Sequence, residues 1–321
     1  MKNFGNTCYI NSVLQTLAQC DNLIDHLNLS LSVIGHPDAI GTDHPSRPVA
    51  EILFALDRSN HDATRAIRNL TQLIKWIDKG GNSSQCSTIL ERFHAGSQHQ
   101  QDPHEFLLLL TSDEVFDMSM ILEYIAYRPI ARSICYNHET PIIEDMVQPG
   151  ENAETFWPIY LPAVQQSNGH SELTDLIRQS YTPTVTEAQC DICHEFKSTV
   201  RLLHDPMDVI IILPERIGRR DDGTIYKRHD MVNLPQKQFN IAAPGQDPRW
   251  YYIRAVIHHI GSSADSGHFY AFTRHDLSDA DNDWIKCDDD REELGVAFSQ
   301  VNTSAAYMFL CCETGPPQAS T

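Results

Sequence analysis

Near its start the chain reads NFGNTCYINSVLQTL, residues 3–17, a turn followed by an amphipathic helix pattern. The glycine–asparagine pair before Thr7 tolerates positive φ, and Thr7 is a residue type that caps helices. From Ile10 onward, apolar residues follow at i+3, i+4 and i+7. The pattern predicts that Cys8 opens a buried helix, where free N–H groups and the helix dipole favour a thiolate. Alternatively, Cys8 is a small buried apolar residue, the usual role of a lone cysteine.

Length and composition are those of a globular protein. The 321 residues suffice for one large domain or two average ones, and 41% of them are hydrophobic. No apolar run approaches the ~18 residues of a membrane span, and Lys2 leads into a polar turn instead of a secretory segment. The nine cysteines lack regular spacing and suit a reducing compartment. We therefore expect an intracellular protein, cytoplasmic or nuclear, or in the host cytosol if the source is a pathogen.

The charge balance bears on partners. Lysine and arginine number 24 against 43 aspartate and glutamate residues, which gives a net charge of −19. This excess of negative charge disfavours nucleic acid and anionic membranes as partners, and it suits a basic substrate segment. We expect a monomer that binds neither nucleic acid nor membrane.

Periodicity predicts a helical first third followed by strands. Helical patterns cover residues 49–57, 62–78, 84–93 and 171–179, and residues 30–48 have loop composition. Strand patterns cover residues 131–135, 141–146, 155–161, 196–203, 208–213, 250–260, 267–274, 283–287 and 305–312. The order of these elements predicts an α+β fold, with a disordered tail at residues 315–321.

A second informative stretch reads QQDPHEFLLLL, residues 100–110. Asp102 fits an N-cap, Pro103 fits the first helical position, and Glu105 completes a capping box. The helix that follows is expected to reach about Tyr124. Helix capping alone would explain both carboxylates.

Two short motifs interrupt the strands. Cys135 and His138 form a C-x2-H pair, and Cys190 and Cys193 form a C-x2-C pair. On tight turns, three thiolates and one imidazole can occupy the corners of a tetrahedron around zinc. We expect a structural zinc site that joins two ribbon ends. Two unrelated turns are the alternative, because the segment between the pairs is longer than in a common zinc finger.

The last informative stretch contains a candidate catalytic histidine. A strand ending near His259 runs into a Gly- and Ser-rich loop, and a second strand opens at Gly267 and His268. One strand later, the sequence WIKCDDD at residues 284–290 offers acidic side chains. One of them could accept the Nδ1–H of His268 and stabilise the imidazolium. A solvated acidic turn is the alternative.

Together these residues resemble the ubiquitin-specific proteases, a family of papain-like cysteine peptidases of the deubiquitinase class. Residues 3–17 match the family's cysteine box, and residues 100–110 match its Gln-Gln-Asp box. The histidine box matches from His259 to Tyr270 and again at residues 284–289. The two cysteine motifs fall where the family places its zinc ligands.

The resemblance implies a papain-like fold in one catalytic domain over residues 1–314. Its parts would be a helical thumb at about 1–125, zinc-bearing β fingers at about 128–205 and a β palm at about 206–314. Because the cysteine box begins two residues after Met1, we expect no regulatory domain ahead of it.

The resemblance also assigns roles. Cys8 would be the nucleophile, His268 the general base and later acid, and Asp288 the residue that orients His268, with Asp289 assisting. Asn3 would donate its amide to the oxyanion. The residues implied to bind the ubiquitin tail are Gln101, Asp102, Glu105, His259 and Gly267.

Some residues depart from the family pattern. His138 stands where a second cysteine is usual, and Cys287 replaces an aromatic residue. Residues 214–217 differ from the basic and aromatic sequence that is common there.

The leading hypothesis is a deubiquitinase that hydrolyses the isopeptide or peptide bond after the C-terminal glycine of ubiquitin, through a Cys8 thioester. Ubiquitin or ubiquitinated proteins would be its partners, and zinc its structural cofactor. The alternatives are an isopeptidase for a ubiquitin-like modifier, a ubiquitin-binding homologue with little activity, and another papain-like chemistry such as transamidation.

Overall fold

The structure is a computed structural model, and the statements below concern the residues that it describes. These are residues 1–32, 44, 46–57, 62–81, 89–93, 101–112, 115–116, 118, 121–125, 129–145, 154–162, 169–203, 208–219, 222–263, 266–274 and 281–317. Most of the loop expected at 30–48, half of the helix expected at 84–93 and the end of the tail expected at 315–321 lie outside them. Within the described residues, no helix has the length and apolar character needed to cross a membrane.

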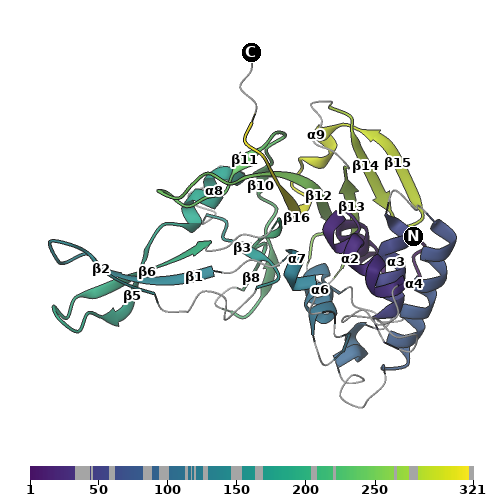
Figure 1. Cartoon of the computed structure of the whole chain (residues 1–321), viewed down its shortest axis with the longest axis horizontal. Helices are drawn as coiled ribbons and strands as arrows, with labels where there is room; N and C mark the ends of the chain where they lie inside the picture. Colours follow the sequence, from purple (N-terminus) through teal and green to yellow (C-terminus); the bar gives the residue numbers. More distant parts are fainter. Residues whose placement is uncertain are drawn as a thin grey trace.

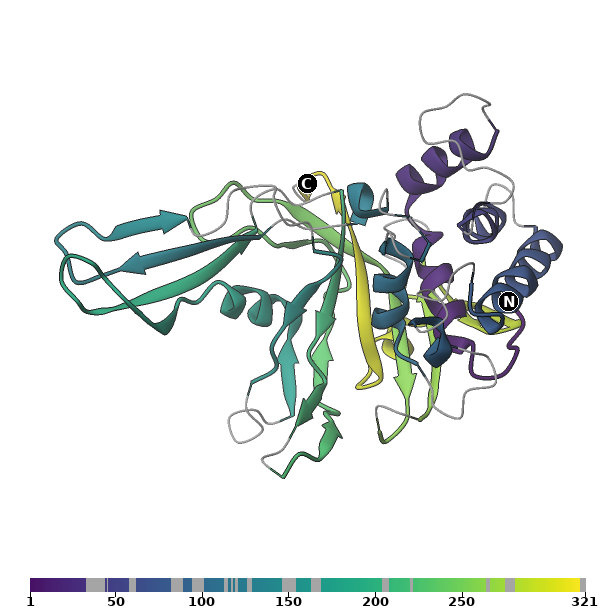
Figure 2. The same ribbon diagram turned by 90° about the horizontal axis from the view of Figure 1, so that it is seen from below.

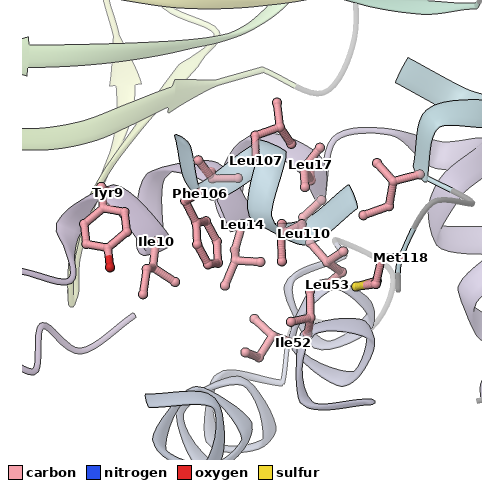
Figure 3. Packing of buried hydrophobic residues seen from close by; sticks show 14 of the residues in the cluster. Tyr9, Ile10, Leu14, Leu17, Ile52, Leu53, Phe106, Leu107, Leu110 and Met118 are labelled. Carbon is pink, nitrogen blue, oxygen red and sulfur yellow. The ribbon is translucent and has the colours of Figure 1, made fainter. Parts of the chain in front are cut away.

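Helices from the first part of the chain gather on one side of the molecule (Figure 1), and we call this group the thumb. They are α1 (Cys8–Leu17), α2 (Asp21–Ser32), α3 (Arg47–Leu56), α4 (Ala63–Asp78), the 3₁₀ turn η1 (Glu91–Phe93), α6 (Pro103–Thr111) and α7 (Leu122–Ile125). All ten residues of α1 are buried. Leu14 and Leu17 face side chains of α3 and α6 such as Leu53 and Leu110 (Figure 3). Each such leucine contributes ~1.5–3 kcal/mol by burial, so the apolar spacing explains why α1 is central.

The helix after the Gln-Gln-Asp box is shorter than its sequence pattern predicts. It ends at Thr111 and not near Tyr124, because Ser112 takes an extended conformation. The chain then turns back, and the amide of Met118 donates to the carbonyl of Leu110 at 3.2 Å. The apolar residues that follow are buried in the thumb core without continuing the helix.

A twisted sheet forms the palm. Its strands are β3 (Trp157–Ile159), β7 (Val209–Pro214), β11 (Phe239–Asn240), β12 (Trp250–Ile260), β13 (His268–Thr273), β14 (Trp284–Asp288), β15 (Arg291–Val296) and β16 (Ala306–Thr314). They lie in the order β15-β14-β13-β12-β16-β7-β3, with β11 beside β12, and all neighbours are antiparallel except the pair of β3 and β7.

The palm sheet separates two cores. In β7, Val209, Ile211 and Leu213 belong to the thumb core, whereas Ile210 and Ile212 belong to the core on the opposite face. The helices α8 (Leu173–Ser180) and α9 (Phe298–Val301) contribute to that second core. Burial on both faces explains the uninterrupted apolar sequence of this strand.

The fingers are a second sheet that projects away from the palm (Figures 1 and 2). Its strands, in spatial order, are β2 (Ile142–Asp145), β1 (Pro129–Cys135), β6 (Phe196–Leu203) and β5 (Thr184–Gln189). Two small pairs complete the described fold: β4 (His170–Glu172) with β10 (Met231–Asn233), and β8 (Ile217–Arg219) with β9 (Ile225–Lys227). The α+β class expected from the sequence is confirmed.

Candidate active site

A tight turn delivers Cys8 to the first position of α1. Gly5 and Asn6 adopt positive φ values of 87° and 37°. The side-chain oxygen of Asn3 accepts hydrogen bonds from the amides of Gly5 at 3.0 Å and Thr7 at 3.3 Å. The Thr7 hydroxyl accepts from the amide of Phe4 at 3.0 Å and makes no capping bond to the helix. Thr7 therefore occupies the N-cap position, as predicted, but its side chain holds the turn together and makes no capping hydrogen bond.

Cys8 lies between this helix terminus and the palm sheet. Its residue surface is 3% exposed, and its Sγ accepts the backbone N–H of Phe269 on β13 at 3.5 Å. The first amides of a helix have no helical acceptor, and the positive end of the helix dipole is located there. Both features favour negative charge on the sulfur.

His268 is the first residue of β13 and contacts both other members of the predicted triad. Its Nε2 lies 2.6 Å from Oδ1 of Asp288, the last residue of β14. Hydrogen bonding with Cys8 and then with Asp288 raises the pKa of His268 to about 9, although burial opposes the rise. The nitrogen that faces the carboxylate is Nε2. The prediction from the sequence, that Nδ1 faces it, is therefore wrong. This ring orientation leaves Nδ1 for the sulfur.

Asp288 is held as a charged acceptor. Burial by itself would raise its pKa, but hydrogen bonds from His268 and Lys286 keep the pKa below its usual value. Nζ of Lys286 lies 3.0 Å from Oδ2 of Asp288. Each carboxylate oxygen thus has its own cationic donor, and the imidazole orientation is fixed.

Asp289 joins the start of the chain to the histidine box. Its oxygens accept from the amide nitrogen of Asn3 at 2.8 Å and from that of Asn11 at 2.7 Å. Asp289 has φ of 53°, and its Oδ2 lies 4.0 Å from Nε2 of His268. The structure therefore brings Asn3 and Asp289 together behind the triad. Because an amide nitrogen has two protons, Asn3 retains one for another acceptor.

The Gln-Gln-Asp box borders a cleft of about 470 Å³ between the thumb and the palm. Asp102 caps α6 by accepting the amide of His104 at 2.8 Å, and the hydroxyl of Tyr307 donates to its other oxygen. Glu105 lines the same cleft, and Glu215 on the palm side faces them. Burial and then the charge of Asp102 raise the pKa of Glu215. The cleft thus has carboxylates on both walls, with Arg216 beside Glu215 on the palm side.

Aromatic contacts connect this cleft with Cys8. Tyr307, in the cleft wall, meets Phe269 edge to face with ring centroids 5.6 Å apart, and the amide of Phe269 is the one that contacts Cys8. The ring of His259 stacks on Phe269 at 4.2 Å and is 2% exposed. Burial and then the charge of Lys227 lower the pKa of His259 to about 4, so its ring is neutral. His259 thus lies beneath the loop that precedes His268.

Gly267 closes the base of that loop. It has φ of 149°, and a Cβ at this position would lie 2.2 Å from the carbonyl oxygen of Ile260. Only glycine fits such an approach. The close approach sets the path of the backbone immediately before His268.

The fingers hold the predicted metal ligands together. The Sγ atoms of Cys135 and Cys193 lie 3.5 Å apart, and Nε2 of His138 lies 3.4 Å from Sγ of Cys190. All four ligand atoms are within 4.8 Å of one another. A tetrahedron with metal–sulfur bonds of ~2.3 Å has edges of about 3.8 Å, so this group can hold a metal ion.

A family model described as ubiquitin carboxyl-terminal hydrolase matches residues 1–310. The chain belongs to the ubiquitin carboxyl-terminal hydrolase family. Similar proteins include ubiquitin carboxyl-terminal hydrolase 25 of Arabidopsis thaliana, 24% identical over 335 residues and covering 100% of this chain and 48% of the relative. Another is the probable ubiquitin carboxyl-terminal hydrolase 16 of Schizosaccharomyces pombe, 22% identical over 302 residues, with coverage of 90% and 61%. The chain spans about half the length of the curated relatives it matches.

Solved structures share the fold of this ubiquitin carboxyl-terminal hydrolase family member. A SAGA DUB module of Ubp8, Sgf11, Sus1 and Sgf73 bound to monoubiquitin gives a TM-score of 0.73 at 15% identity, covering 99% of this chain and 69% of that chain. The same module bound to ubiquitin aldehyde gives 0.72 at 15% identity, with coverage of 99% and 70%. These matches confirm the fold expected from the resemblance.

Three residues of the candidate site were not predicted from the sequence. Asn11, which bonds Asp289, is one of four buried polar residues of α1, so the sequence alone does not distinguish it from Gln15. Lys286 lies two residues before Asp288 and therefore on the same face of β14, which is a usable signal. Tyr307 donates a hydrogen bond to Asp102, which lies 205 residues earlier in the sequence, so no local pattern predicts this contact.

Proposed function

We propose that the protein is a deubiquitinase that cleaves the bond after the C-terminal glycine of ubiquitin. The observation that carries the proposal is His268 bonded to both Cys8 and Asp288, with Cys8 at a helix N-terminus, in a chain of this family. A nucleophile, a base and an orienting carboxylate within hydrogen-bonding reach are the minimum for thiol-dependent acyl transfer.

In the first half-reaction the Cys8 thiolate attacks the carbonyl carbon of the terminal glycine, and the π electrons move onto oxygen. The backbone N–H of Cys8, at the start of α1, and the second amide proton of Asn3 are suited to stabilise this oxyanion. As the intermediate collapses, the imidazolium of His268 gives its proton to the departing lysine amine. The product is a thioester with Cys8 and a released amine.

In the second half-reaction His268, now neutral, removes a proton from water. The resulting hydroxide attacks the thioester carbonyl, and the bond to sulfur breaks. Cys8 leaves as a thiolate and His268 again carries its proton. Asp288 stabilises the imidazolium in both steps and holds the ring so that Nδ1 faces the sulfur.

The cleft suits the tail of ubiquitin, which contains arginines and ends in two glycines. Asp102, Glu105 and Glu215 present carboxylates that attract guanidinium groups. Gly267 keeps the backbone close to β12 immediately before His268.

We further propose that the metal group in the fingers holds structural zinc. Three thiolates and an imidazole are ligands that zinc prefers, and the distances fit tetrahedral coordination. Zinc would cross-link the end of β1 to the turn after β5 and stabilise the fingers. None of the described cysteines forms a disulfide.

The proposal is tested by steady-state hydrolysis of ubiquitin that bears a fluorescent amide at its C-terminus. We expect turnover by the wild type and none by Cys8→Ser. The same leaving group on ubiquitin-like modifiers separates a ubiquitin enzyme from an isopeptidase for another modifier. Tight binding of ubiquitin without turnover would instead indicate a binding homologue and contradict the proposal.

A further inference from the structure

Strand β12 and strand β13 form the hairpin that carries His268, here called the catalytic hairpin. On its other side, β12 extends beyond the start of β16. β12 pairs with β16 up to His258, which lies opposite Ala306, the first residue of β16. The amide of His259 still reaches the carbonyl of Ala305 at 2.9 Å. On this edge, the carbonyls of His259 and Gly261 lie past the start of β16, so the ladder with β16 offers them no N–H donor. Backbone carbonyls in a buried position need a donor.

Lys227 supplies that donor. It is the last residue of β9 and is 9% exposed. Its Nζ donates to the carbonyl oxygens of His259 at 3.1 Å and Gly261 at 3.0 Å. The ammonium therefore replaces two ladder hydrogen bonds at the end of β12.

The surroundings of Lys227 disfavour its charged form. Burial and then the charge of Arg216 lower the pKa of Lys227 to about 8. Among the ion pairs of the described residues, none involves Lys227, so neutral carbonyls are its hydrogen-bond partners. A buried charge without a counter-ion destabilises the fold. An apolar residue would serve packing better, which indicates that the two hydrogen bonds are the reason for the lysine.

The two carbonyls flank Ile260, the cross-strand partner of His268. The strands approach so closely that a Cβ on Gly261 would lie 2.3 Å from the carbonyl oxygen of Ser266. A shift of β12 at this point is therefore transmitted to His268 across the hairpin.

We propose that Lys227 is a positioning residue, whose ammonium fixes the end of β12 so that His268 stays aligned with Cys8 and Asp288. It acts through the backbone and does not touch the reacting atoms. The inference rests on the proposed function only in assuming that His268 is the acid and base that acts with Cys8.

The test is the rate of Cys8 alkylation by iodoacetamide as a function of pH, read by peptide mass mapping. Lys227→Met removes the donors while keeping the length of the side chain, and Lys227→Arg keeps both charge and donors. Lys75→Met is the matched control, because Lys75 is exposed on α4. In Lys227→Met we expect Cys8 to be alkylated ~10- to 100-fold more slowly at neutral pH, because misplacing a reacting group by a small distance costs about that much in rate. The pH dependence that reflects protonation of His268 should also be lost. Lys227→Arg should restore the wild-type profile.

Hydrogen exchange separates positioning from general support of the fold. In Lys227→Met we expect faster exchange at residues 259–261 and 266–269, with α1 and the finger strands unchanged. Faster exchange throughout the chain would overturn the proposal, as would an alkylation profile equal to that of the wild type. Because alkylation needs no ubiquitin, a wild type with a normal profile that fails to hydrolyse ubiquitin would refute only the proposed function.

Discussion

Replacing Asp288 with asparagine removes the negative charge that lies 2.6 Å from Nε2 of His268. The contact of His268 with Cys8 and the residual charge of Asp289, 4.0 Å away, remain. An opposite charge at this range moves a pKa by about 1 to 3 pH units. The side chains of His268 and Asp288 are 36% and 27% exposed, so solvent screens the pair and the lower part of that range applies. We expect the pKa of His268 to fall from about 9 by roughly 1 to 2 pH units.

The assay is kcat/KM for fluorogenic ubiquitin between about pH 6 and pH 10, together with Cys8 alkylation over the same interval. The alkaline limb reports the loss of the His268 proton, so it should move toward neutral pH in Asp288→Asn. A fall in kcat should accompany the shift, because asparagine does not stabilise the imidazolium. Asp290→Asn is the matched control, since it removes the same charge from an exposed side chain two residues away. An alkaline limb that stays in place in Asp288→Asn, or moves equally in both variants, would refute the reasoning.

Three further outcomes follow from the structure. Asn3→Ala should lower kcat by ~10²–10³ with KM nearly unchanged, the effect of one lost oxyanion donor, and equal loss in KM would assign Asn3 to binding instead. Removal of zinc by a chelator, or Cys190→Ser, should increase hydrogen exchange in β1, β5 and β6 while leaving α1 protected, and unchanged exchange in the fingers would contradict a structural metal. Because the folded-state pKa of His268 lies at about 9 against 6.5 for the free side chain, the stability from its interactions is complete below pH 6.5 and is lost as the pH rises through 9. The difference in melting temperature between wild type and Asp288→Asn should therefore shrink across that interval, and a difference that grows with pH would be inconsistent with a raised pKa.

Local sequence patterns predicted the central elements well. The bounds of α1 and of the long strands β7, β12 and β16 follow from apolar periodicity, because burial on one or both faces requires it. The sequence reasoning missed β5 and β15, whose residues are mostly exposed and have no apolar alternation. Both lie at sheet edges, where hydrogen bonding to one neighbour defines the strand and side-chain type does not.

The site was predictable in composition but not in orientation. Cys8, His268 and Asp288 stand in short motifs, and the structure brings them together. Which ring nitrogen of His268 faces Asp288 depends on a rotamer set by packing, so the sequence could not settle it. The bond between Asn3 and Asp289 spans 286 residues and likewise has no local signature.

The role proposed for Lys227 could not be predicted from the sequence. Its sequence neighbourhood on β9 gives no hint of the positioning role that we propose, which rests on where β16 begins. Only a three-dimensional register shows that two carbonyls beside the catalytic hairpin need a donor.

The central claim is that Cys8 is a nucleophile directed at the ubiquitin C-terminus. The most direct test is the intact mass of the protein after incubation with ubiquitin that bears a C-terminal electrophile, for wild type and Cys8→Ala in parallel. The account predicts a gain of one ubiquitin in the wild type and none in the variant. No gain in a folded, zinc-loaded wild type, or an equal gain in Cys8→Ala, would contradict it.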